Sequence, residues 1–284
     1  MRIAYLVSAY KLPEQLVRLL RRLHTDRSHF VVHVDRKTDR RVYDEMVGGA
    51  RELGCVDFVS RHVCHWGGFG HVRATIKGID HLDAEGIPFD YAVLLTGQDY
   101  PIRAPGEIER YLENANGRSF IGYWPVPHAG WSGRGGQDRL ERWHLVWRRH
   151  LHLTAPLVRR RVPGGLTPWG GSPYWCLSRQ VVDHVRSLLS ASPELVRFFE
   201  HVWIPDELFF QTIVLNSPLR DSVVNDNLRY IDWSRSPAPA ILGRLDLDEI
   251  TSSGKLFARK FDTEVDAGIL DLLDRRIDGG GDAV

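Results

Sequence analysis

Two short segments of the chain carry acids and cations of the kind that a group-transfer reaction uses. Pro205-Asp206-Glu207 offers Glu207 as a general base, and Lys255–Phe261 carries Arg259 and Lys260 between aromatic residues. Moving a sugar off a nucleotide diphosphate needs both, since a carboxylate must take the acceptor proton and cations must stabilise the departing diphosphate. From the residues alone, Glu207 is more readily a first-turn helix acid stabilised by the helix dipole, and the two cations can equally be a solvated pair.

The usual acidic pair for a divalent metal is broken in this sequence. Such a pair is an Asp-x-Asp turn after an apolar strand, but the turn after Tyr91–Leu95 reads Gly97-Gln98-Asp99. The one literal match, Asp246-Leu247-Asp248, follows no apolar strand and is typical of a helix start. We therefore expect no metal and no other cofactor, and we interpret Asp99 as a structural residue that holds the turn before Pro101.

Apolar strands alternate with helices through the first third of the chain. Strands are predicted at Ile3–Val7, Phe30–Val34, Val56–Val59 and Tyr91–Leu95, with helices near 13–23, 40–53 and 70–82. This alternation predicts an α/β fold with a doubly wound, mostly parallel sheet. Ligands bind at the carboxyl ends of such strands, which places Ser8–Tyr10, Asp35 and Thr96–Asp99 around one crevice. Asp35 can equally cap the helix that follows it.

A long segment from Gly122 to Gly171 departs from this pattern. Gly, Pro, Trp, His and Arg dominate it, and one helical stretch is predicted near Gln137–His150. Its length indicates a functional excursion rather than a second core. Elsewhere, His65 and Trp66 precede two glycines, which suggests a close approach of the backbone to a ligand, although Trp66 fits an ordinary core position equally well.

Seven segments carry a resemblance to a known family. They are Ala4–Lys11, Val32–Lys37, Cys64–Gly68, Leu94–Ile102, Gly171–Trp175, Pro205–Glu207 and Leu256–Phe261. In this order they resemble the core-2/I-branching β-1,6-N-acetylglucosaminyltransferases, glycosyltransferase family 14, which also includes peptide O-xylosyltransferases. The resemblance implies a GT-A-like, Rossmann-type sheet flanked by helices, inversion at the sugar carbon and no metal.

The resemblance also implies roles for individual residues. By the family pattern Glu207 is the base, Lys260 binds the donor diphosphate and Asp35 reads the uracil. Arg235 and Arg244 both fall where the family has a second diphosphate cation, and we choose Arg244. The predicted donor-binding residues are Ser8, Tyr10, Asp35, Cys64, Trp66, Arg244 and Lys260. The predicted acceptor-binding residues are Glu141, Arg142, Trp143 and Trp175.

These roles predict transfer of a sugar, first of all N-acetylglucosamine, from a UDP-sugar to a glycan or glycolipid hydroxyl, forming a β-1,6 branch. Two alternatives stay open. One is a xylosyltransferase that uses UDP-xylose, and the other is a non-catalytic glycan- or nucleotide-binding protein on the same fold. The second alternative predicts loss of Glu207 or Lys260, and both are present.

Composition limits the partners and the compartment. Among 284 residues, 37 Lys and Arg nearly balance 36 Asp and Glu, and a net charge of +1 gives no reason to expect nucleic acid. The three cysteines form no metal-binding spacing and suggest a reducing compartment. With no apolar run long enough to cross a membrane, we expect an unanchored cytoplasmic protein.

We expect one domain at 1–277, with a nucleotide-binding half at 1–121 and an acceptor and catalytic half at 122–277, followed by a disordered tail at 278–284. Arg148, Arg149 and Arg159-Arg160-Arg161 are interpreted as surface charge or, alternatively, as a peripheral membrane contact through lipid phosphates.

Overall fold

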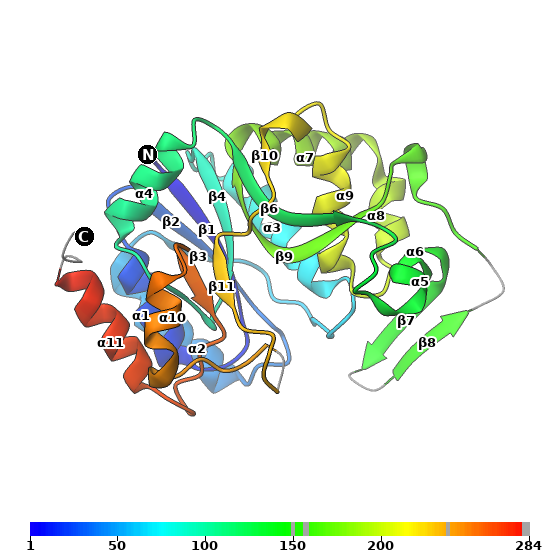
Figure 1. Ribbon diagram of the computed structural model, residues 1–284. Helices are drawn as coiled ribbons and strands as arrows, with labels where there is room; N and C mark the ends of the chain where they lie inside the picture. Colours follow the sequence, from blue (N-terminus) through cyan, green and yellow to red (C-terminus); the bar gives the residue numbers. More distant parts are fainter. Residues whose placement is uncertain (149–150, 156–158, 237–238, 280–284) are drawn as a thin grey trace. The chain divides into compact units, whose positions relative to one another are not determined.

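The computed structural model describes residues 1–148, 151–155, 159–236 and 239–279 (Figure 1). The chain divides into two compact units. Unit 1 comprises Met1–Ser60, Ile87–Asn116 and Leu228–Val284, and unit 2 comprises Arg61–Gly86 and Gly117–Asn227. The expectation of one domain at 1–277 with halves 1–121 and 122–277 stays a prediction.

Unit 1 is built on four parallel strands in the order β3-β2-β1-β4. Their bounds are β1 Ile3–Ala9, β2 Ser28–Val34, β3 Val56–Phe58 and β4 Tyr91–Thr96. The crossovers from β1 to β2 and from β2 to β3 run through α1 (Pro13–Leu23) and α2 (Arg40–Ala50). Val31, Val32 and Val34 on β2 are all buried, as expected for a strand inside a parallel sheet. The predicted α/β class with a mostly parallel sheet flanked by helices is confirmed.

A smaller sheet in unit 1 carries the cationic segment. Its strand order is β11-β12-β5, with bounds β11 Arg229–Ile231, β12 Phe257–Arg259 and β5 Asp99–Pro101. Strand β12 is antiparallel to β5, and Arg259 lies opposite Asp99 in the register. This pairing brings the segment around Lys260 beside the turn that follows β4. The remaining helices of unit 1 are α4 Pro105–Asn114, α10 Leu247–Ser252 and α11 Gly268–Asp278.

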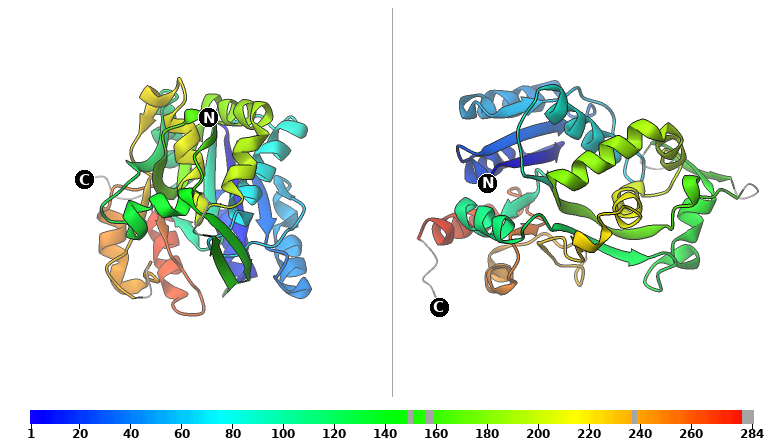
Figure 2. Two further views of the ribbon diagram at one scale, coloured as in Figure 1. Left: turned by 90° about the vertical axis from the view of Figure 1, so that its right-hand side faces the viewer. Right: turned by 90° about the horizontal axis from the view of Figure 1, so that it is seen from above.

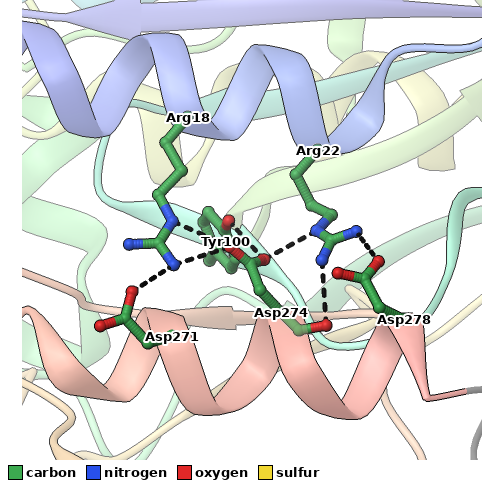
Figure 3. A network of polar contacts seen from close by, with 6 residues as sticks. All are labelled: Arg18, Arg22, Tyr100, Asp271, Asp274 and Asp278. Atoms are coloured by element: carbon green, nitrogen blue, oxygen red, sulfur yellow. Dashed lines mark hydrogen bonds and ion pairs between the residues drawn. The ribbon is translucent and has the colours of Figure 1, made fainter.

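Ion pairs fasten α11 to α1 (Figure 3). The Asp274 carboxylate accepts hydrogen bonds from Arg18 at 2.7 Å, from Arg22 at 2.7 Å and from the Tyr100 hydroxyl at 2.8 Å. Burial raises the pKa of Tyr100, and so does its bond to Asp274. Asp278, the last residue of α11, pairs with Arg22 at 2.6 Å, so the predicted tail begins beyond it, and its residues 280–284 lie outside the described residues.

Unit 2 has its own strands, ordered β10-β6-β9. Strand β6 (Ser119–Pro125) is parallel to β10 (Val223–Val224) and antiparallel to β9 (Trp169–Ser178). The helices of this unit include α3 Gly70–Ala84, α7 Arg179–Ala191, α8 Pro193–Phe199 and α9 Phe209–Leu215. Its core is aromatic, because Trp175, Phe199, Phe209 and Phe210 are all buried there. None of the helices in the described ranges is both long enough and apolar enough to span a bilayer.

The excursion of unit 2 differs from the prediction. It contains α5 Ser132–Gly135, α6 Gln137–Glu141, β7 Trp143–Arg148 and β8 Leu151–Ala155. The helix predicted near Gln137–His150 therefore ends at Glu141, and a hairpin follows. His144 is buried whereas Leu145 is exposed, the two-residue alternation of a strand. Arg149 and His150 lie outside the described residues. Figure 2 shows β7 and β8 as a two-stranded ribbon at the periphery of unit 2.

Candidate functional site

The carboxyl ends of β1, β2 and β4 meet in unit 1, as the sequence predicts. The backbone N–H of Asp35 donates to the Ala9 carbonyl at 2.9 Å, and that of Gly97 donates to the Ser8 carbonyl at 2.9 Å. The three turns are thus tied together at one edge of the sheet, where ligands of doubly wound folds bind.

Asp35 is buried, and its carboxylate contacts Lys37 within the turn that follows β2. Its Oδ1 accepts the backbone N–H of Lys37 at 2.9 Å, and its Oδ2 lies 3.3 Å from the Lys37 ammonium. The following helix, α2, is capped by Asp39, whose Oδ1 accepts the backbone N–H of Arg41 at 2.8 Å. The alternative interpretation of Asp35 as the cap of that helix is therefore wrong.

Polar side chains link the end of β1 to the segment after β12. The Tyr10 hydroxyl donates to Gln98 Oε1 at 3.2 Å, and Gln98 Nε2 donates to the Phe261 carbonyl at 3.0 Å. The Lys11 ammonium pairs with Asp262 at 2.5 Å. These contacts hold Tyr10, a predicted donor residue, near the segment that carries Lys260.

Lys260 lies half-buried in this part of the unit. Burial lowers the pKa of its ammonium, and the positive charges of Arg259 and Lys11 lower it further, while Asp262 opposes them. Within the described part of the chain, this ammonium has no hydrogen bond and no ion pair. A cation held among other cations at the carboxyl edge of a sheet is well suited to an anionic ligand.

The acids considered as metal ligands have other roles. Asp99 is completely buried, accepts a hydrogen bond from the Thr96 backbone N–H and lies 3.7 Å from Arg259, so its predicted role in the turn is confirmed. Asp246 lies at the start of α10 and pairs with Arg235 at 2.8 Å. A Cβ at Gly97 would lie 3.5 Å from the Ala9 Cβ, so any side chain at this position would contact an apolar neighbour.

The two candidate arginines differ in their contacts. Arg235 pairs with Asp232 at 2.6 Å as well as with Asp246, so two carboxylates neutralise it. Arg244 is exposed and uses only Nε, which lies 3.2 Å from Asp266 Oδ2. Its terminal nitrogens make no hydrogen bond among residues that the structure describes. Arg244 is thus the more available of the two for a further anion.

In unit 2, Glu207 lies in a 3₁₀ turn at Pro205–Glu207 that precedes α9. It is therefore not in the first turn of an α-helix, and the expected helix-dipole stabilisation does not apply. Burial raises the pKa of Glu207, the neighbouring Asp206 raises it further, and Arg139 opposes both through an ion pair of 2.8 Å. Burial also raises the pKa of Asp206, to about 6.

Arg139 is a residue of this site that the sequence did not identify. Its guanidinium lies 3.9 Å above the Trp131 ring on one side and reaches Glu207 on the other. The only signal was the abundance of Arg and Trp in the excursion, which does not single out one arginine.

The predicted acceptor residues occupy different environments. Glu141 pairs with Arg134 at 2.5 Å, Arg142 is exposed, and Trp143 lies partly exposed, with the Arg160 guanidinium 4.5 Å from its ring centroid. These three residues join α6 to β7 and are accessible. Trp175 has no exposed surface and packs on Phe210 in the core, so the prediction that it contacts the acceptor is wrong.

Cys64 is buried, whereas Trp66 is 65% exposed and meets Trp203 edge-on, so the alternative of Trp66 as core is wrong. A Cβ at Gly67 would lie 2.5 Å from the Trp203 ring. This glycine therefore permits the close packing of Trp203, and its presence is no sign of a ligand.

Comparisons with known proteins extend over almost the whole chain. The family model described as Core-2/I-Branching enzyme matches residues 3–251. Xylosyltransferase 2 of Rattus norvegicus is 29% identical over an alignment of 306 residues, which covers 98% of this chain and 34% of the relative. Xylosyltransferase 1 of Canis lupus familiaris is 26% identical, covering 96% of this chain and 30% of the relative. The chain thus spans about a third of the length of these curated relatives.

Among solved structures, a putative glucose-1-phosphate thymidylyltransferase from Bacillus anthracis, in complex with a sucrose, is similar with a TM-score of 0.34 and 11% identity. The similarity covers 66% of this chain and 75% of that chain.

Proposed function

We propose, from the premise that this chain belongs to the core-2/I-branching enzyme family and is a glycosyltransferase, that it moves a sugar from UDP to an acceptor hydroxyl with inversion and without a metal. The observation that carries the proposal is the environment of Glu207. Its carboxylate is half-buried, its pKa is raised by burial, and Arg139 holds it at 2.8 Å. A general base works best when its pKa is raised towards the working pH and its position is fixed.

In the proposed reaction, Glu207 takes the proton of the acceptor hydroxyl. The acceptor oxygen forms a bond to the anomeric carbon as the bond from that carbon to the UDP oxygen breaks. Attack from the face opposite to UDP inverts the configuration, and UDP leaves with the electron pair of the broken bond. The departing diphosphate gains charge, which fixed cations stabilise.

Unit 1 supplies the proposed donor contacts. Lys260 binds the diphosphate, because its ammonium forms no ion pair among the described residues and the charges of Arg259 and Lys11 act on it. Arg244 assists it with its terminal nitrogens. The Asp35 carboxylate accepts the N–H of the uracil, while Ser8 and Tyr10 line the neighbouring turn at the end of β1. Cys64 and Trp66, which the family resemblance also assigns to the donor, belong to unit 2 and stay predictions.

Metal-independent action fits the residues at the turn after β4. Mg²⁺ bound to a diphosphate takes oxygen ligands, usually one or two of them from carboxylates. Gly97 offers no carboxylate, and Asp99 is buried beside Arg259. We assign the neutralising role to Lys260 and Arg244 instead.

The sugar donor is the finer point of the proposal. UDP-xylose now stands before UDP-N-acetylglucosamine, because xylosyltransferases match 98% of this chain at 29% identity. N-acetylglucosamine stays the second candidate, since the family model that matches is the one of the core-2/I-branching enzymes. The proposed acceptor is a hydroxyl of a glycan, a glycolipid or a peptide, with a β-1,6 branch as the linkage if the donor is N-acetylglucosamine.

The test is a donor screen with the whole chain. Release of UDP from UDP-xylose and from UDP-N-acetylglucosamine is measured without acceptor, with UDP binding followed by calorimetry. Faster release from UDP-xylose supports the first candidate, and faster release from UDP-N-acetylglucosamine replaces it with the second. Absence of both UDP binding and UDP release in the folded protein would overturn the proposal.

A further inference from the structure

The β7–β8 hairpin of unit 2 has two faces of different character. On the inner face, His144 is buried, and a Cβ at Gly68 would lie 3.4 Å from Val146. His152 stacks on Trp203 with ring centroids 3.8 Å apart and an interplanar angle of 6°. These contacts fix the hairpin to its unit through the even-numbered residues.

The outer face is apolar and exposed. Leu145 is 52% exposed, Trp147 is 76% exposed and Leu153 is 66% exposed. Leu145 and Leu153 are directly opposite each other in the strand register, and Trp143 lies on the same face because it is two residues before Leu145. Trp147 follows Val146 at the point where the register shifts. Among the described residues, four of the ten exposed large apolar side chains belong to this hairpin. Such a concentration marks an interaction surface rather than scattered surface residues.

Arginines border the face at the base of the hairpin. The backbone N–H of Arg160 donates to the Glu141 carbonyl at 2.8 Å, which holds the segment Arg159–Arg161 beside the start of β7. Arg142, Arg159 and Arg161 are exposed there. The nearby acid, Glu141, is already paired with Arg134. The described border of the apolar face is therefore cationic. The Arg148 side chain and Arg149, which the sequence also suggested, lie outside the described part.

We propose that this hairpin face docks on an anionic lipid bilayer. Trp147, Leu145 and Leu153 enter the boundary between headgroups and acyl chains, where Trp is favoured, and the bordering arginines pair with lipid phosphates. The apolar side chains thus meet the apolar part of the bilayer, and the arginines meet its anionic phosphates. The proposal concerns a surface outside the donor contacts and does not depend on the identity of the sugar.

Two other occupants fit the face less well. A glycan would place hydroxyls over the Leu145–Leu153 pair, which offers no hydrogen-bond partner, so those hydroxyls would lose water without compensation. A second copy of the chain, related by a two-fold axis, would bring the same arginines together and be opposed by their repulsion.

The experiment is vesicle co-sedimentation of the whole chain. Vesicles of phosphatidylcholine alone are compared with vesicles that also contain phosphatidylglycerol. The test variant combines Leu145→Ser, Trp147→Ser and Leu153→Ser. Its matched control is Trp233→Ser, which removes a Trp that is 62% exposed in unit 1. Circular dichroism and thermal unfolding show that each variant is folded.

The expected result is binding to the anionic vesicles that weakens with salt, falls at least about tenfold in the triple variant and is unchanged by Trp233→Ser. Arg159→Gln combined with Arg161→Gln should also weaken it. The proposal is overturned if the wild-type chain binds neither vesicle or if the triple variant binds as tightly as the wild type. It is equally overturned if the triple variant keeps vesicle binding and loses self-association or binding of a soluble acceptor.

Discussion

Nη1 of Arg139 lies 2.8 Å from Oε2 of Glu207, and the same guanidinium covers the Trp131 ring at 3.9 Å. The arginine is thus fixed by an aromatic face on one side and by the carboxylate on the other. Burial raises the pKa of the Glu207 carboxyl, and the charge of Arg139 lowers it. We therefore expect Arg139 to position the proposed base and to favour its ionised form.

Arg139→Gln should move the low-pH limb of the kcat/KM profile to higher pH. Without the guanidinium, the pKa of Glu207 rises further, so its basic form is lost at a higher pH and activity at mildly acidic pH falls most. Arg73→Gln breaks another ion pair of unit 2, with Glu200 at 2.5 Å, and should leave the limb in place. A limb that stays unmoved in Arg139→Gln would remove the arginine from the site.

Lys260→Ala should weaken binding of UDP and of the UDP-sugar. A hydrogen bond to a charged group contributes about 1.5–3 kcal/mol, which is roughly one to two orders of magnitude in affinity. Calorimetry with UDP measures the loss. The control is Lys255→Ala, which lies before β12 on the same segment and should bind UDP as the wild type does. Unchanged affinity in a folded Lys260 variant would contradict the proposed role.

Asp274→Asn should destabilise the protein, because this carboxylate bridges Arg18, Arg22 and Tyr100 (Figure 3). Loss of charge at a largely covered bridging group should cost about 1–3 kcal/mol in the free energy of unfolding. Urea unfolding tests it, with Asp271→Asn as the control. Among the described residues Asp271 pairs only with Arg18, and it is mostly exposed, so its loss should cost at most about 1 kcal/mol. If both variants lose the same free energy of unfolding, the bridging position of Asp274 contributes nothing extra to stability.

The parallel strands of unit 1 could be predicted because their signal is local. Buried apolar runs that alternate with amphipathic helices define β1, β2 and β4, and the rule that ligands bind at carboxyl ends then brings together Ser8, Asp35 and Gly97. The family was also predicted correctly, because its seven segments are short but keep their order along the chain.

The features that the sequence did not predict depend mostly on contacts between residues distant in sequence. Arg139 reaches Glu207 across 68 positions, and no local pattern distinguishes it from the other arginines of the excursion. Trp175 was predicted to bind the acceptor by the family resemblance, but it is completely buried and packs on Phe210 of α9. The stretch after Glu141 was predicted to be helical, although its exposed and buried residues alternate as in a strand.

Transfer should persist in excess EDTA. The prediction follows from Gly97, which offers no ligand to a metal, and from the half-buried Lys260, which offers positive charge of its own. UDP release with the preferred donor is measured before and after chelation, and again after addition of manganese. Complete loss in EDTA that manganese restores would contradict metal-independent action. Lys260→Ala provides the matched comparison, since it should weaken UDP binding equally with and without EDTA.

Glu207→Gln should nearly abolish transfer and spare donor binding. A positioned base typically contributes about 10²–10⁴-fold in rate, and Gln keeps the shape of Glu but is not basic at neutral pH. The loss should therefore fall on kcat, while UDP affinity by calorimetry stays close to that of the wild type. Loss of a base should lower the rate at least about a hundredfold. If Glu207→Gln keeps more than about a tenth of the wild-type rate, Glu207 is not the base.

Asp206→Asn is the variant that distinguishes the two adjacent acids. The Asp206 charge raises the pKa of Glu207, so its removal should lower that pKa. If Glu207 is the base, the low-pH limb of kcat/KM moves to lower pH in Asp206→Asn and disappears in Glu207→Gln. If Asp206 is the base instead, with its pKa of about 6, the limb persists in Glu207→Gln and disappears in Asp206→Asn. The two hypotheses predict opposite results, because the low-pH limb disappears in a different variant under each. One set of pH measurements on both variants therefore assigns the proton acceptor.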